Sequence, residues 1–222
     1  MIAEFFGKLF FPSRCLYCNR VIGFSGTNIC DKCAPQIKAV KRPCGLAIQK
    51  YGREMQFITA AYAPLFYERP AKNAILRMKF GKYTTGIREL ADGMAMEWNA
   101  SEAPQVDCLL AVPCTKKERK GRRCNLPQML AEILSVSLGV PLWKNVLYKQ
   151  RETPRQMGLA GAARRKNVKD AYAVTDAALF AGKTVLLIDD VLTTGSTLNE
   201  CAKTICGAGA AACYTLTIAV TK

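Results

Sequence analysis

Residues 185–197 constrain the fold more than any other part of the chain. They read Val-Leu-Leu-Ile-Asp-Asp-Val-Leu-Thr-Thr-Gly-Ser-Thr. Residues 185–188 are consecutively apolar, which is typical of a strand buried on both faces of a parallel sheet. Asp189 and Asp190 stand where this strand is expected to end, and a helical pattern follows over residues 198–205. This order predicts an α/β fold, in which ligands bind beyond the carboxyl ends of the strands.

The loop between this strand and helix predicts a phosphate site. A loop that enters a helix presents unpaired backbone N–H groups and the positive end of the helix dipole. Hydroxyl side chains add donors, and a glycine lets the backbone approach a ligand closely. The loop offers both, in Thr193, Thr194, Gly195, Ser196 and Thr197.

The two carboxylates need a ligand with a second feature, because alone they would repel a phosphate. Carboxylates accept hydrogen bonds from vicinal hydroxyls or coordinate Mg²⁺, and a ribose 5-phosphate carries both a diol and a phosphate. Adjacent strand residues point to opposite faces, so the chain must turn at Asp189 and Asp190 if both are to reach one ligand. The alternative is an aspartate pair that ends a strand and caps the next helix.

The same string resembles the phosphoribosyl pyrophosphate (PRPP) motif of type I phosphoribosyltransferases. The resemblance implies that Asp189 and Asp190 bind the ribose hydroxyls and that residues 193–197 surround the 5-phosphate. It also implies Mg²⁺ bound together with PRPP.

Two Cys-x-x-Cys pairs near the start of the chain predict a structural zinc site. Cys15 with Cys18 and Cys30 with Cys33 can supply four thiolates to one tetrahedral ion. The chain has no histidine, so a closed site must use cysteine. The alternatives are a disulfide framework or chance spacing, but the other cysteines lie in apolar segments, as reduced core residues do. Its expected role is to stabilise a segment too short to form a core alone.

Length and composition predict one good-sized domain and a small appendage. The chain has 222 residues, of which 50% are hydrophobic, enough for a packed core. We expect an N-terminal helix and zinc ribbon over residues 1–50 and the larger domain over 51–222. No apolar run reaches the roughly 18 residues of a membrane span, and residues 1–11 do not have the pattern of a secretory signal. We therefore expect a cytoplasmic protein.

Positive charge predicts polyanionic partners. The chain has 32 basic and 17 acidic residues, a net charge of +15. The basic residues gather in two clusters, and the second spans residues 149–169. The first is a loop containing Lys116, Lys117, Arg119, Lys120, Arg122 and Arg123. A charge run is also compatible with a solvated helix face, but the position of these clusters beside the phosphate site favours contacts to pyrophosphate and nucleic acid.

The remaining apolar patterns alternate between strands and helices. This alternation predicts a doubly wound, mostly parallel sheet of the phosphoribosyltransferase type, with a small N-terminal zinc ribbon. The expected strands cover 57–65, 106–112, 171–174, 185–188 and 212–220, and the expected helices cover 68–80, 85–98, 126–138 and a segment from 197.

The middle of the chain carries residues in the pattern of a known family. They are Val112, Pro113, Arg122, Asn125, Arg151, Thr153, Pro154, Gln156, Leu159, Arg164 and Asn167. Together with the cysteine pairs they resemble the ComF family of competence proteins, also described as GntX-like, over nearly the whole chain. Members pair a cysteine zinc ribbon with a phosphoribosyltransferase domain.

The chain also departs from the family pattern. Arg123 and Cys124 stand where the family has Gly-Phe, and Leu126 replaces a glutamine. Of a second set of cysteine pairs that many relatives carry, only Cys44 with Gly45 remains, so the sequence does not predict a second zinc site.

The resemblance implies handling of single-stranded DNA in cytoplasmic steps of DNA uptake and natural transformation, with a helicase and recombination mediators as further partners. Two functions stay open: a DNA-uptake factor that binds PRPP without chemistry, or a phosphoribosyltransferase that acts in salvage or on a macromolecule, with an unidentified acceptor. A third option is a nucleic-acid regulator that responds to PRPP. In an enzyme, Asp189 and Asp190 would bind PRPP, and Arg151 or Arg164 would act with the basic loop on the leaving pyrophosphate. No residue is evident as a general base.

Overall fold

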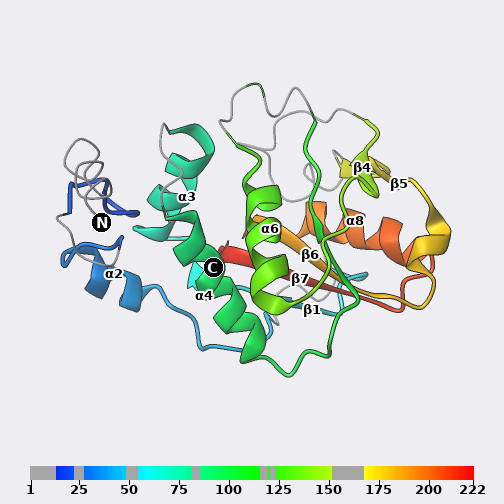
Figure 1. The fold of residues 1–222 in the computed structure, drawn as a ribbon, viewed down its shortest axis with the longest axis horizontal. Coiled ribbons are helices and arrows are strands. Elements are labelled where there is room, and N and C mark those ends of the chain that lie inside the picture. The colour runs from blue at the N-terminus through cyan, green and yellow to red at the C-terminus, as the bar shows by residue number, and fades with distance from the viewer. Residues whose placement is uncertain are drawn as a thin grey trace, which may run out of the picture.

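A parallel sheet forms the centre of the molecule (Figure 1). The computed structural model describes residues 14–22, 28–48, 55–81, 86–115, 120, 124–151 and 168–222. The sheet has five strands in the order β1-β7-β6-β3, with β2 also paired to β7, and every pairing is parallel. The strands are β1 (Ala60–Tyr62), β2 (Leu65–Phe66), β3 (Cys108–Ala111), β6 (Thr184–Leu192) and β7 (Ala212–Val220).

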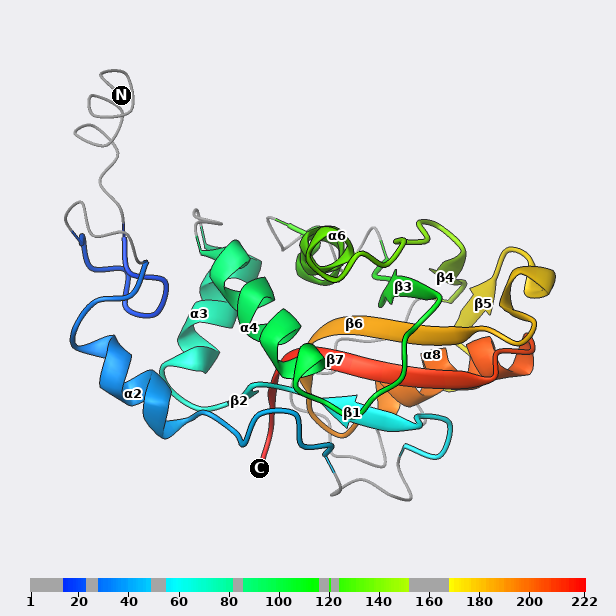
Figure 2. The ribbon, with the colours of Figure 1, turned by 60° about the horizontal axis from the view of Figure 1, so that its bottom comes forward.

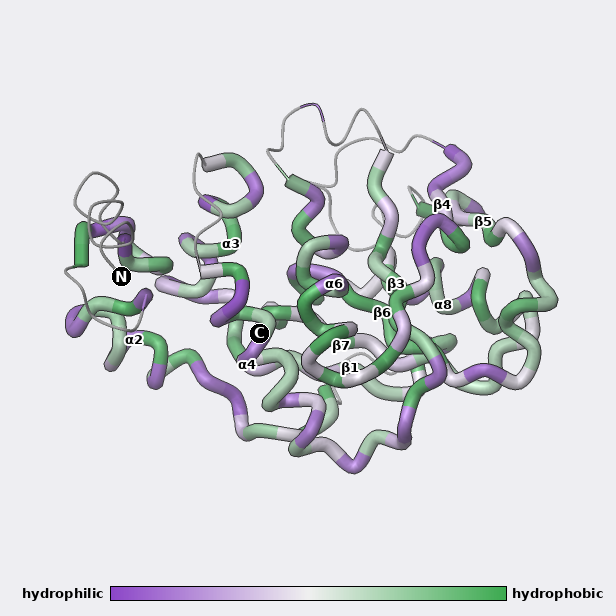
Figure 3. The backbone as a smooth tube through the Cα atoms, in the orientation of Figure 1, coloured by the Kyte–Doolittle hydropathy of each residue, from purple (hydrophilic) through white to green (hydrophobic). Residues whose placement is uncertain are grey.

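Helices cover both faces of the sheet (Figure 2). Leu186 and Ile188 of β6 share a hydrophobic cluster with residues of α3, α4 and α6, whereas Val185 and Leu187 share another with residues of α8. The doubly wound α/β architecture is therefore confirmed. Figure 3 shows hydrophobic residues along the sheet and hydrophilic ones along the segment that joins α4 to β3. The helices are α3 (Ala71–Phe80), α4 (Ile87–Asn99), α6 (Leu126–Leu138) and α8 (Ser196–Gly207), with a short 3₁₀ helix, η1 (Ala177–Phe180).

Strand β6 extends beyond its apolar run, so the predicted strand end at Ile188 was wrong. Its pairing with β7 continues through Asp189, opposite Thr217, as far as Leu192, opposite Val220. Backbone hydrogen bonding to a neighbouring strand decides where this strand ends, and side-chain polarity does not. Asp189 and Asp190 consequently lie inside the strand.

Other predicted boundaries differ less. The helix over 126–138 and the strand over 212–220 have the predicted bounds. The strand predicted over 57–65 is two short strands, β1 and β2, and the next helix begins at Ala71.

A second, antiparallel sheet was not predicted. It pairs β4 (Leu147–Lys149) with β5 (Tyr172–Val174), and Tyr148 lies opposite Ala173. The two strands are far apart in the sequence, so no turn signal joins them. A backbone hydrogen bond from Asp170 to Glu200 Oε1 (2.8 Å) ties this sheet to α8.

The N-terminal segment packs against α3 and α4. It contains α2 (Cys33–Ala39), which lies beside α3 in Figures 1 and 2. Leu16, Ile37 and Val40 are buried in the cluster that contains Ile75 and Leu90 of these helices. The helix expected over residues 1–11 lies outside the described residues. None of the helices that the structure describes has both the length and the apolarity needed to cross a bilayer.

Candidate functional site

Asp189 and Asp190 lie on opposite faces of β6. Asp190 is 5% exposed and forms an ion pair with Lys79 of α3, with 2.8 Å between Nζ and Oδ2. Asp189 lies on the same face as Leu187, which α8 covers. On this face, burial and then the charge of Asp189 raise the pKa of the Cys201 thiol of α8. β6 does not turn at this pair, so the two carboxylates leave the strand in opposite directions.

Gly195 shapes the loop that begins α8. Its φ of +77° lies in the left-handed region, and its carbonyl accepts a hydrogen bond from the backbone N–H of Asn199 (2.8 Å). A Cβ atom at this position would lie 2.8 Å from Cγ of Met55. Both the backbone conformation and the close approach require glycine here.

The hydroxyl groups of the loop converge at the N-terminus of α8. The Thr194 and Ser196 hydroxyls are hydrogen bonded at 2.9 Å, and the Ser196 backbone N–H points to Thr194 Oγ1 at 3.4 Å. The first backbone N–H groups of an α-helix have no partner within the helix and attract anions. The Thr194 and Ser196 hydroxyls thus lie together at the first turn of α8.

Two distant segments anchor this loop, and neither was predicted from the sequence. Thr221 donates its backbone N–H to the Leu192 carbonyl (2.9 Å) and its hydroxyl to the Thr193 carbonyl (3.3 Å). The Phe57 backbone N–H donates to Asn199 Oδ1 at 2.9 Å. No sequence motif marks these residues, because they meet only through the tertiary fold.

Lys79 is another site residue that was not predicted. It lies in the last turn of α3, and its only sequence signal is a positive charge near a helix end. Burial and then the charge of Asp190 raise the pKa of the Tyr67 phenol. Asp190 therefore interacts with a residue of α3 through its ion pair with Lys79.

Most of the predicted basic residues fall outside the described residues. This holds for Lys116, Lys117, Arg119, Arg122, Arg123 and Arg164, whereas Lys120 is described and exposed. Residues 116–123 lie between β3 and α6, which begins after Asn125, whereas Arg164 lies between β4 and β5 in the sequence. Arg151 is described: its Nη2 donates to the Lys169 carbonyl at 2.7 Å, so it lies beside the β4-β5 sheet.

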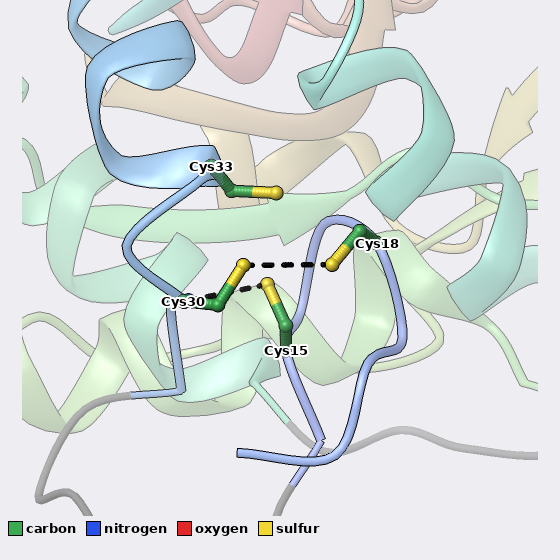
Figure 4. A group of neighbouring side chains, drawn as sticks. All are labelled: Cys15, Cys18, Cys30 and Cys33. Atoms are coloured by element: carbon green, nitrogen blue, oxygen red, sulfur yellow. Dashed lines mark hydrogen bonds between the residues drawn. The ribbon is translucent and has the colours of Figure 1, made fainter.

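The four predicted cysteines form one cluster (Figure 4). Their sulfur atoms all lie within 4.8 Å of one another. Four thiolates at about 2.3 Å from a tetrahedral zinc ion are roughly 3.8 Å apart, and Cys18 Sγ lies 3.6 Å from Cys30 Sγ. All eleven cysteines of the chain lie in the described residues, and none of them forms a disulfide. The cluster fits a structural metal such as zinc.

The electrostatics of the cluster suit a metal site. The Cys30 backbone N–H points to Cys15 Sγ at 3.4 Å. Burial opposes ionisation of Cys15, but backbone hydrogen bonds from Cys30, Cys18 and Tyr17 lower its pKa to about 6. Burial and the neighbouring sulfurs raise the pKa of Cys33. A cation is therefore needed if all four cysteines are to be thiolates together.

Comparison with known proteins agrees with this arrangement. The model of the phosphoribosyl transferase domain matches residues 128–221, which include β6, the loop and α8. Competence protein F of Haemophilus influenzae is 28% identical over 212 residues, which cover 87% of this chain and 91% of that protein. DNA utilization protein YhgH of Escherichia coli K12 is 27% identical over 203 residues, which cover 89% of this chain and 86% of that protein.

The similarity extends over both parts of the chain. YhgH of Salmonella typhi is 24% identical over 219 residues, which cover 90% of this chain and 93% of that protein. The resemblance read from the sequence is confirmed. The chain resembles competence protein F over most of its length, and its four-cysteine module precedes the residues that match the phosphoribosyl transferase domain.

Proposed function

We propose that this protein binds PRPP with Mg²⁺ at the carboxyl end of β6, binds single-stranded DNA, and acts in cytoplasmic steps of DNA uptake. The observation that carries the proposal is the hydroxyl-lined N-terminus of α8 directly after the Asp189-Asp190 pair. This arrangement offers a phosphate site and diol acceptors within one strand-loop-helix unit.

The residues of this unit have separate roles in the proposal. The 5-phosphate binds residues 193–197, where the backbone N–H groups and the hydroxyls of Thr194 and Ser196 donate to it. Asp189 accepts hydrogen bonds from the ribose diol. The ion pair with Lys79 neutralises the charge of Asp190, so the two adjacent carboxylates do not make the site strongly anionic.

The same carboxylates fit Mg²⁺ as well. Mg²⁺ prefers oxygen ligands and usually keeps several waters while it bridges one or two carboxylates and substrate phosphates. Asp189 would hold such an ion, and the ion would supply charge neutralisation at the pyrophosphate. The basic residues 116–123 and Arg151 would contact the same pyrophosphate.

Support for the DNA part of the proposal comes from charge and from relatives. The net charge of +15 favours a polyanion. The relatives that match most of the chain are named competence protein F and DNA utilization protein. We propose that residues 116–123 and the 149–169 segment contact DNA phosphates, and that a DNA-uptake helicase and recombination mediators act with this protein.

The alternative function is phosphoribosyl transfer from PRPP to an unidentified acceptor. The match of residues 128–221 to the phosphoribosyl transferase domain favours it. The acids, the loop and the basic residues would keep the roles given above, and the basic residues would stabilise the pyrophosphate as it leaves. Incubation with PRPP, Mg²⁺ and a panel of nucleobases separates the two functions, because only an enzyme releases pyrophosphate at a steady rate.

Calorimetric titration with PRPP tests the common part of both functions. We expect saturable binding at one site per chain in the presence of Mg²⁺, and at least tenfold weaker binding for Asp189→Asn, since a hydrogen bond to a charged group contributes about 1.5–3 kcal/mol. The matched control is Asp176→Asn. Asp176 accepts a hydrogen bond from the backbone N–H of Ala178 (2.9 Å), as Asp189 accepts one from the backbone N–H of Asp190, but Asp176 lies at η1. Absence of PRPP binding by the wild-type protein would exclude the site.

Binding of a fluorescent oligonucleotide at several salt concentrations tests the DNA part. We expect log K to fall with log salt at a slope of about −0.7 per phosphate contact. Replacing Lys116 and Lys117 by alanine should make the slope shallower. Replacing Lys144 and Lys183, which form surface ion pairs with Glu132 and Asp107, should leave it unchanged. A slope near zero for the wild-type protein would rule out phosphate contacts.

A further inference from the structure

Three consecutive residues in the last turn of α3 contact three different functional parts of the molecule. Arg77 contacts the cysteine module, Met78 contacts Cys124, which follows the basic segment in the sequence, and Lys79 contacts Asp190. Residues two apart in an α-helix point about 200° away from each other, so Arg77 and Lys79 extend in nearly opposite directions. Figure 2 shows α3 between the N-terminal module and the sheet.

The Arg77 side chain binds the backbone of the segment that carries the first cysteine pair. Its guanidinium donates to the carbonyls of Cys15 (3.3 Å), Leu16 (3.1 Å) and Tyr17 (2.9 Å). These carbonyls belong to the turn that presents Cys15 and Cys18 to the cluster (Figure 4). These three hydrogen bonds tie the turn that carries Cys15 and Cys18 to the end of α3.

Lys79 and Met78 reach the other side of the helix turn. The Lys79 and Asp190 side chains are 16% and 8% exposed, so their 2.8 Å ion pair is largely shielded from water. Cys124, the residue after the basic segment, donates its thiol to the Met78 carbonyl at 3.3 Å. A displacement of this turn would therefore move a cation away from Asp190 and break the hydrogen bond of Cys124 together.

We propose that the last turn of α3 couples the cysteine cluster to the phosphoribosyl site, with Lys79 as a positioning residue that orients Asp190. The coupling is positive: metal at the cysteines fixes Arg77, Arg77 fixes the helix turn, and Lys79 then holds Asp190, whose backbone N–H orients the ligand-binding Asp189. Because binding free energies are linked reciprocally, PRPP must raise the affinity of the cysteines for zinc as much as zinc raises the affinity for PRPP. This inference rests on the PRPP binding proposed above.

Zinc affinity in the presence and absence of PRPP tests the coupling in the full chain. The protein is titrated with zinc against a chromophoric chelator, with and without saturating PRPP and Mg²⁺. We expect PRPP to strengthen zinc binding by about fivefold or more in the wild-type protein, the lower end of usual coupling energies. We expect no effect of PRPP on zinc affinity in Lys79→Met, and recovery of the effect in Lys79→Arg.

A double-mutant cycle on PRPP affinity separates coupling from general destabilisation. With zinc bound, Arg77→Met and Lys79→Met should each weaken PRPP binding about fivefold, and the double variant should be no weaker than Lys79→Met alone, because both residues act along one route. Lys144→Met is the matched control, since Lys144 forms an ion pair of 2.7 Å with Glu132 at an exposed position. It should bind PRPP as the wild-type protein does.

The outcomes distinguish this inference from the proposed function. No PRPP binding by the zinc-loaded wild-type protein would contradict the proposed function itself. PRPP binding that leaves zinc affinity unchanged in the wild-type protein, or additive effects of Arg77→Met and Lys79→Met, would overturn the coupling alone. If Arg77→Met does not fold, the zinc titration of the wild-type, Lys79→Met and Lys79→Arg proteins still decides.

Discussion

The backbone N–H of Asp190 donates a hydrogen bond of 2.8 Å to Asp189 Oδ1, so one aspartate of the pair orients the other. The Asp190 carboxylate is itself occupied by Lys79. The two acids of the motif are therefore not equivalent: Asp189 is half-buried and oriented by the backbone, whereas Asp190 belongs to a buried ion pair. This difference leads to separate expectations for their substitution.

Asp190→Asn should destabilise the protein more than Asp189→Asn. Removing the Asp190 charge leaves the Lys79 ammonium largely buried without its partner, which costs about 1–3 kcal/mol. Asp189 does not belong to this buried ion pair, so we expect less than half of that loss for its substitution. Urea unfolding at neutral pH measures both. The double variant Lys79→Met/Asp190→Asn should recover part of the stability, and equal losses for the two single variants would contradict the assignment.

Gly195→Ala should weaken both folding and anion binding. The φ of +77° disfavours any side chain, and the new methyl group would meet Met55 Cγ at 2.8 Å, so we expect a loss of at least about 1 kcal/mol. Gly182→Ala is the matched control, because Gly182 has a φ of +68° and an added Cβ there would have no other atom within 4 Å. Thermal unfolding should show a smaller loss of stability for Gly182→Ala. Added phosphate should raise the unfolding temperature of this control but not that of Gly195→Ala.

Zinc should be retained by the four clustered cysteines and by no other cysteine. We expect about one zinc ion per chain in the wild-type protein and little in Cys33→Ser, since three thiolates bind a structural ion far more weakly than four. Elemental analysis after dialysis against a mild chelator measures this. Cys44→Ser and Cys114→Ser, which lie outside the cluster, should retain the metal. Full zinc content in Cys33→Ser would exclude the site.

Glu97 should make stability depend on pH. It is 1% exposed, Arg42 Nη1 lies 3.7 Å from its Oε1, and burial raises its pKa above the ordinary value of 4.5 despite the opposing charge of Arg42. Between pH 4.5 and the raised pKa, the native state binds more protons than the unfolded state. The free energy of unfolding therefore falls as the pH rises through this window.

Comparison of the wild-type protein with Glu97→Gln isolates this contribution. The difference in unfolding free energy, wild type minus variant, should decrease from pH 4.5 upward and level off above the raised pKa. Chemical denaturation at a series of pH values measures it, and other titrating groups cancel because both proteins carry them. A difference that stays constant or increases with pH would contradict the assignment.

Local sequence patterns predicted the parts of the fold that depend on neighbouring residues. The helix over 126–138 and the strand over 212–220 have the predicted bounds, because their apolar periodicity and turn residues agree with their burial. The four cysteines converge as their spacing predicts. The strand end at Ile188 was predicted wrongly, since pairing with β7 extends β6 to Leu192.

The amino-acid sequence alone specified the fold class, the cysteine cluster and the strand-loop-helix unit, because each shows as a pattern of residue types along the chain. The three-dimensional fold was needed to establish that Lys79 pairs with Asp190, that Met55 packs over Gly195 and that Arg77 contacts the cysteine module. These contacts join residues distant in the chain, and packing of α3 against both the sheet and the N-terminal segment brings them together. A linear pattern carries no signal for such contacts.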